Sequence, residues 1–132
     1  MGQQQLLLIV LGVIIVGIAI IVGINLFSEQ AAASNFDAVM NDLQRIAATS
    51  QQWYLKPIAL GGGGRTFASV SFSNINVSAS NENGSYTISN PQQNDFTLTG
   101  IGLEDGDDDG TPITISFTVY RDSTSTPTIT SR

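Results

Sequence analysis

One short segment carries the residue types that could bind a metal ion. Asp105, Asp107 and Asp109 alternate along the chain and are followed by Gly110, which matches the first half of a D-x-D-x-D-G calcium loop. Alternating carboxylates can converge on one hard cation, and the glycine permits a sharp turn. The closing bidentate acid is missing, because the twelfth position of the loop is Ser116. The segment therefore predicts either a calcium site or a solvated acidic hairpin.

Catalytic chemistry has few candidates. The chain contains no cysteine and no histidine, which excludes disulfides, thiolate–zinc sites and imidazole acid–base catalysis. The carboxylates gather in the acidic segment rather than around a predicted pocket, and no candidate base has a partner. We therefore expect that the protein is not an enzyme and that it requires no cofactor, with calcium as the one candidate ion. A formal charge of -6 argues against a nucleic-acid partner, because phosphates call for a basic surface.

Two triplets fit the N-glycosylation pattern. They are Asn76-Val77-Ser78 and Asn83-Gly84-Ser85. Such triplets also arise by chance in a chain rich in asparagine and serine. Asn76 and Asn83 are therefore candidate modification sites.

The element that dominates the sequence is the apolar run from Leu6 to Ile24, 19 residues without a charged or hydrogen-bonding side chain. As a helix it would span about 28 Å, close to the roughly 30 Å of a bilayer's hydrocarbon core. Gly23, followed by Asn25, is where we expect this helix to bend or loosen. The large apolar residues predicted to form the membrane span and the core of an assembly are Leu6, Leu7, Leu8, Ile9, Val10, Leu11, Val13, Ile14, Ile15, Val16, Ile18, Ile20, Ile21, Val22 and Ile24.

A cleaved signal peptide is the alternative interpretation of this run, and it fits poorly. Signal peptides begin with basic residues, whereas no lysine or arginine precedes Leu6. Their apolar stretch is also about 7–15 residues long, shorter than the run seen here. The segment is better explained as a helix that stays in lipid or packs among other apolar helices.

An amphipathic helical pattern follows the apolar run. Its apolar residues recur at helical spacing, namely Phe36, Val39, Met40, Leu43, Ile46, Ala47 and Trp53. No proline interrupts residues 2–56, and Pro57 supplies a stop. The simplest prediction is one helix of about 50 residues, with Trp53 and Tyr54 packed under a sheet. Alternatively, Ser34 and Asp37 could cap a separate helix after a break near 25–34.

The remaining chain has the pattern of a β domain. The tract Gly61–Gly64 is predicted to be a flexible connection. Period-2 alternation then predicts strands around residues 68–72, 75–79, 86–88, 96–98, 113–119 and 129. One apolar face per strand indicates an antiparallel sheet with a single buried side, which the amphipathic helix would cover.

The predicted fold class is α+β, with a long N-terminal helix packed on a small antiparallel sheet. Its parts are an apolar half-helix at residues 1–28, an amphipathic half-helix at 29–56, a glycine-rich connection at 57–65 and a β domain at 66–132. This organisation resembles that of type IV pilins and pseudopilins. The resemblance covers the whole chain as architecture, but its residue-level match is limited to the N-terminal segment.

The resemblance implies a pilin-like fold and a structural role. The expected protein is a subunit of an extracellular filament on the cell surface, polymerising through its apolar helix and anchored in the membrane before assembly. Its expected partners are further copies of itself in a helical homopolymer, the membrane, a leader peptidase and the pilus assembly machinery. The alternatives are a minor pseudopilin of a secretion system and a monomeric membrane-anchored surface binding module.

The sequence departs from the family's pattern at several positions. The family's mature chain usually starts with an N-methylated phenylalanine and has glutamate at its fifth position. If Met1 is the mature terminus, Met1 and Gln5 occupy those places in this chain. If cleavage falls after Gly2, the fifth residue is Leu7. The family's helix-kinking proline and C-terminal disulfide are also missing, which leaves Gly23 as the nearest substitute for the kink.

Overall fold

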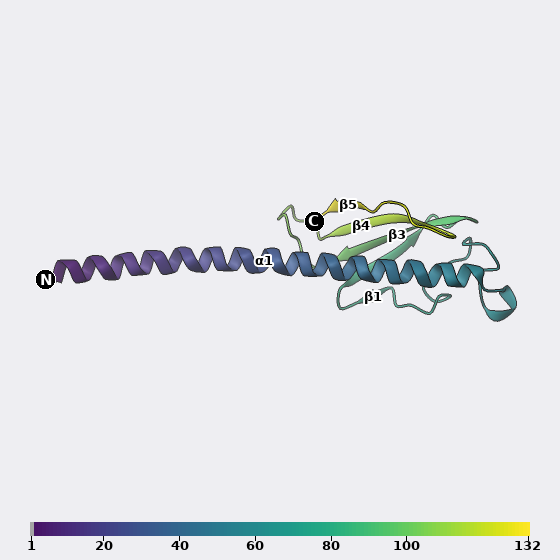
Figure 1. Ribbon diagram of the computed structural model, residues 1–132, viewed down its shortest axis with the longest axis horizontal. Helices are drawn as coiled ribbons and strands as arrows, with labels where there is room; N and C mark the ends of the chain where they lie inside the picture. Colours follow the sequence, from purple (N-terminus) through teal and green to yellow (C-terminus); the bar gives the residue numbers. More distant parts are fainter. Residues whose placement is uncertain (1) are drawn as a thin grey trace. The chain divides into compact units, whose positions relative to one another are not determined.

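The computed structural model describes residues 2–132 and has an α+β fold, as predicted (Figure 1). Its elements are helix α1 (Gly2–Leu55), the 3-10 helix η1 (Ile58–Leu60) and strands β1 (Ser80–Asn81), β2 (Gly84–Ser89), β3 (Asp95–Gly102), β4 (Thr114–Tyr120) and β5 (Thr128–Ser131). The strands form one sheet in the order β1-β2-β3-β4-β5, and every neighbouring pair is antiparallel. The chain divides into two compact units at Ala31, and the second unit, residues 32–132, holds the sheet.

Helix α1 is unbroken from Gly2 to Leu55, which confirms the prediction of one long helix. The alternative of a separate helix capped by Ser34 is wrong. Residues 25–55 contain neither proline nor glycine, and Ala31-Ala32-Ala33 are the strongest helix formers at the place where a break was considered. Local propensity therefore favours continuation of the helix.

The glycine tract is folded against the end of α1, and the flexibility of this connection stays a prediction. The N–H of Gly63 donates to the carbonyl of Trp53 at 2.8 Å, and that of Gly64 to the carbonyl of Lys56 at 3.0 Å. The last carbonyls of a helix have no partner inside it, and these bonds satisfy them. Gly61 and Gly64 have φ of +83° and +60°, which glycine adopts at no steric cost. A Cβ on Gly63 would lie 2.6 Å from the Trp53 ring, so a larger residue would displace the tract.

The hydrophobic core lies between residues 32–54 of α1 and the inner face of the sheet. Leu98 pairs with Phe117 and Phe96 with Val119 across β3 and β4, and all four side chains point to the buried side. Trp53 and Tyr54 are buried and extend this core to the end of α1, where the ring centroid of Tyr54 lies 4.6 Å from that of Phe67. Its buried residues are Ala32, Val39, Leu43, Ile46, Ala47, Trp53, Tyr54, Phe67, Val70, Ile75, Tyr86, Phe96, Leu98, Ile113, Ile115, Phe117 and Val119.

The strands predicted around 86–88, 96–98, 113–119 and 129 correspond to β2, β3, β4 and β5, but those predicted at 68–72 and 75–79 are wrong. Residues 67–79 form successive turns, with the N–H of Val70 donating to the carbonyl of Phe67 and that of Ile75 to the carbonyl of Ser71. The Asn74 side chain donates to the carbonyl of Ser69 at 2.7 Å. Asparagine and serine side chains stabilise turns in this way, and the buried apolar residues here are turn residues that happen to alternate.

Gly100 on β3 allows the helix to approach the sheet closely. A Cβ at this position would lie 2.9 Å from Cγ1 of Val39 and 3.0 Å from Cδ1 of Leu43. We expect Gly100→Ala to reduce the free energy of unfolding by about 1–3 kcal/mol, because overpacking forces the helix away from β3. Thermal unfolding measures the effect, with Gly23→Ala as control, because a Cβ there meets nothing within 4 Å. An unchanged Tm for Gly100→Ala would contradict the close packing.

Candidate functional site

The first unit of the described chain exposes a continuous apolar surface on α1. Every predicted assembly-core residue is at least half exposed, and no part of the most apolar window of the helix is buried. The same surface continues through Leu26 and Phe27, which are 57% and 77% exposed. Sequence reasoning omitted these two residues because Asn25 interrupts the run, although their helical position was a usable signal. The helix continues through Gly23 without a break, and flexibility there stays a prediction.

This surface can interact only through apolar contact. Its length and composition are sufficient for α1 to cross a membrane. Contiguous exposed apolar patches larger than a few hundred Å² mark interaction sites on soluble proteins. Burying one exposed leucine or isoleucine side chain gains about 1.5–3 kcal/mol, so the surface as a whole favours a lipid or protein environment strongly.

The structure brings the three predicted metal ligands together in the loop between β3 and β4. One carboxylate oxygen from each of Asp105, Asp107 and Asp109 lies within 4.8 Å of the others. Oδ2 of Asp105 accepts a hydrogen bond from the N–H of Gly110 at 2.8 Å, while its Oδ1 is buried without a hydrogen-bond partner. Desolvation raises the pKa of Asp105, but hydrogen bonds from the Gly110 N–H and from Asp107 outweigh it and lower the pKa below its usual value.

These residues fit only part of a calcium shell. Calcium takes six to eight oxygen ligands, whereas the loop supplies three carboxylates. Ser116 lies in β4, paired with Thr99 and Thr128, and so does not close the loop as a calcium-binding acid would. Asp109 also accepts a hydrogen bond from the N–H of Thr111 at 2.7 Å. The carboxylates thus stabilise the loop by themselves, and calcium binding stays a prediction.

The two candidate glycosylation sites differ in their surroundings. Asn76 is exposed in a turn, with φ of +56°. Asn83 is half-buried, and its Nδ2 donates to Oδ2 of Asp42 at 2.9 Å. A glycan on Asn83 would be attached to the nitrogen atom that makes this bond, whereas the exposed Asn76 carries no such constraint.

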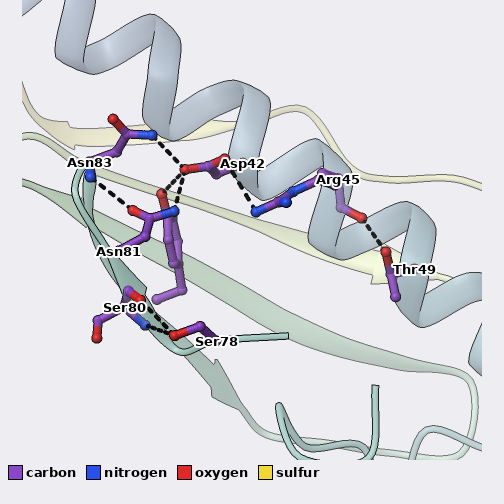
Figure 2. A network of polar contacts seen from close by, with 8 residues as sticks. Asp42, Arg45, Thr49, Ser78, Ser80, Asn81 and Asn83 are labelled. Carbon is purple, nitrogen blue, oxygen red and sulfur yellow. Dashed lines mark hydrogen bonds and ion pairs between the residues drawn. The ribbon is translucent and has the colours of Figure 1, made fainter. Parts of the chain in front are cut away.

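Asp42 is the centre of a polar network that joins α1 to the first hairpin of the sheet (Figure 2). Its Oδ2 accepts hydrogen bonds from Nδ2 of Asn81 at 2.7 Å, Nδ2 of Asn83 at 2.9 Å and the hydroxyl of Tyr86 at 2.6 Å. Nη2 of Arg45 lies 3.5 Å from Oδ1. Sequence analysis did not predict this network, because helical periodicity marks the apolar positions of α1 and gives no signal for a polar contact at Asp42.

The charge of Asp42 is stabilised by these donors. Desolvation raises the pKa of Asp42, but the hydrogen bonds from Asn83, Tyr86 and Asn81 and the Arg45 guanidinium outweigh it, so the pKa is lowered. Burial and the bond to this carboxylate raise the pKa of Tyr86. The pair therefore favours an ionised Asp42 and a neutral Tyr86.

We expect the free energy of unfolding of the β domain to fall at acid pH, as Asp42 becomes protonated. Because its pKa is lower folded than unfolded, its contribution is complete above the unfolded value of about 4 and is lost as pH falls through the folded value. Asp42→Asn should therefore reduce stability at pH 6, by about 1–3 kcal/mol, and flatten the fall in Tm between pH 6 and pH 3. Asp37→Asn, at an exposed position of the same helix, is the control. Parallel pH profiles for wild type and Asp42→Asn would contradict the role of the network.

Comparisons with known proteins assign no family to this chain. No protein-family model, curated protein or solved structure matches it. The apolar surface of α1 and the folded β domain are therefore the observations from which a function can be proposed.

Proposed function

We propose that the protein is the structural subunit of an extracellular type IV pilus-like filament on the cell surface. The observation that carries this proposal is the apolar surface of residues 6–27, which nothing in the described chain covers. In this account the segment anchors each subunit in the membrane and then becomes the shared core of the filament. The β domain forms the outer shell, and no chemical reaction is involved.

The driving force for assembly is the burial of apolar surface between copies. In lipid, apolar helices gain no hydrophobic energy by associating. Once extracted from lipid, each helix exposes several hundred Å² that only sibling helices can cover. At about 25 cal/mol per Å² this burial contributes on the order of 10 kcal/mol per subunit. Because a head-to-tail contact need not close into a ring, its repetition produces a helical filament.

The properties of the β domain support a position on the outside of the proposed filament. Its own core is buried against residues 32–54 of α1, so it does not depend on the filament to cover it. Its loops are polar and acidic, with a formal charge of -6 on the whole chain, which keeps an exposed shell soluble. A leader peptidase and an assembly machinery are the further partners that the resemblance to pilins implies.

Fractionation of cells that express the chain tests the proposal. We expect the protein to be abundant in sheared extracellular material that contains thin filaments, with residues 6–24 detected intact by mass spectrometry. Recovery solely from detergent-extracted membranes, as a monomer, would contradict the filament and support the membrane-anchored binding module. A short periplasmic assembly without extracellular material would support the minor pseudopilin.

A further inference from the structure

A second group of exposed aliphatic side chains lies at the C-terminal end of α1. Leu55, Ile58 and Leu60 are 60%, 74% and 69% exposed. The backbone that carries them is held by hydrogen bonds, since the N–H of Gly61 donates to the carbonyl of Ile58 and those of Leu60 and Gly62 donate to the carbonyl of Pro57. The aliphatic side chains are thus presented to solvent by an ordered loop.

Two cations flank these side chains. Lys56 follows the helix and Arg65 follows the glycine tract, where its N–H donates to the carbonyl of Tyr54, and both side chains are exposed. The ion pair found among residues 2–132 joins Arg45 to Asp42, so neither Lys56 nor Arg65 takes part in it. We call Leu55, Lys56, Ile58, Leu60 and Arg65 the basic end of the β domain.

The opposite end of the β domain combines an exposed aliphatic side chain with acidic residues, and its charge is therefore opposite to that of the basic end. Asn35, near the start of the helical segment that packs on the sheet, accepts hydrogen bonds from the N–H groups of Leu103 and Glu104 at 2.9 and 3.3 Å. From Asn35 to Leu55 the helix rises about 30 Å, so the loop after β3 and η1 lie at opposite ends of the sheet (Figure 1). This acidic end presents Leu103, which is 65% exposed, beside the acids of residues 104–109.

We infer that the basic end of one copy docks on the acidic end of the next copy. Leu103 would meet the aliphatic side chains of the basic end, while Lys56 and Arg65 would face the carboxylates of residues 104–109. Charge complementarity selects a second copy as the occupant, because the same chain carries both an aliphatic-basic and an aliphatic-acidic surface. The two surfaces differ, so the contact is heterologous and can repeat along a filament without closing. The inference rests on the proposed filament and adds a contact between the outer domains.

Cross-linking through introduced cysteines tests this contact, because the natural chain has none. We expect the double variant Ile58→Cys with Leu103→Cys, treated in sheared filaments with a short bismaleimide, to give a ladder of dimers, trimers and higher species. Each single variant should remain monomeric, and filaments mixed from the two single variants should stop at dimers. Filaments without a ladder would overturn the docking, as would dimers from a single variant alone, which indicate a symmetric contact.

Charge reversal tests whether opposite charges hold the two surfaces together, or whether the introduced cysteines react merely because the domains are near each other. Lys56→Glu with Arg65→Glu should lower the yield of cross-linked species at least tenfold, and Asp107→Lys with Asp109→Lys in the same chain should restore it. The matched control is Lys56→Arg with Arg65→Lys, which keeps both charges. Undiminished cross-linking after charge reversal would overturn the complementarity.

The failure of this inference differs from the failure of the proposed function. If the wild type and the double variant both form filaments, but the double variant gives no ladder of cross-linked species, the proposed function stands and the docking is overturned. If the wild type forms no filaments, the proposed function fails, and the same double variant in detergent decides the docking. A ladder there supports end-to-end docking, and monomers overturn it.

Discussion

Ile15→Glu is expected to remove the protein from filaments almost completely, with at least a hundredfold loss from the sheared extracellular fraction. Ile15 lies in the middle of the exposed apolar surface and is 57% exposed in the isolated chain. In a shared core its replacement would bury an unpaired carboxylate in every subunit, at a cost of several kcal/mol. Each 1.4 kcal/mol changes an equilibrium constant tenfold, so such a cost is sufficient for the expected loss. Quantitative immunoblotting of the sheared and membrane fractions measures the effect.

Two controls separate the position of the charge from the charge itself. Ile15→Leu keeps the volume and polarity of the side chain and should assemble normally. Ser28→Glu adds the same charge just beyond the apolar surface and should assemble far better than Ile15→Glu. Normal filament yield from Ile15→Glu would show that this face of the helix lies outside the core.

Phe67→Ala is expected to destabilise the β domain by about 3–5 kcal/mol, the usual cost of removing a buried phenylalanine side chain. Phe67 is fully buried, with its ring centroid 4.6 Å from that of Tyr54 and 5.1 Å from that of Phe96. The residue therefore joins the end of α1 to β3. Since domains of this size are stable by about 5–15 kcal/mol, the variant should lose a large part of its stability.

Urea denaturation of the full chain in detergent measures this loss as a lower midpoint. Phe27→Ala is the matched control, because it makes the same chemical change at a side chain that is 77% exposed. It should leave the unfolding of the β domain unchanged. Equal midpoints for Phe67→Ala and Phe27→Ala would contradict the assignment of Phe67 to the core.

Helical periodicity and apolar alternation were sufficient to predict the main architecture. The recurrence from Phe36 to Trp53 has the period of a helix, and the alternation in β3 and β4 has the period of a strand with one buried face. These patterns survive in the structure because one face of residues 32–54 of α1, and one face of β3 and of β4, is buried against the other layer. The alternation between residues 68 and 79 failed as a predictor because local side-chain bonds to the backbone favoured turns.

Contacts between distant parts of the chain could not be predicted from spacing. Asp42 meets its three donors on the first hairpin only after the helix packs on the sheet, and no periodic signal links positions 39–44 residues apart. The hydrogen bonds of the glycine tract depend likewise on the carbonyls of Trp53, in the last turn of α1, and of Lys56, directly after the helix. The basic end of the β domain was also invisible in the sequence, since exposure is a property of the fold.

Electron cryomicroscopy of sheared filaments, with helical reconstruction, is the most direct test of the shared core. The account predicts that residues 6–24 from neighbouring subunits pack together around the filament axis and that the β domains lie outside. Filaments in which this segment is cleaved off or lies on the outer surface would contradict the account.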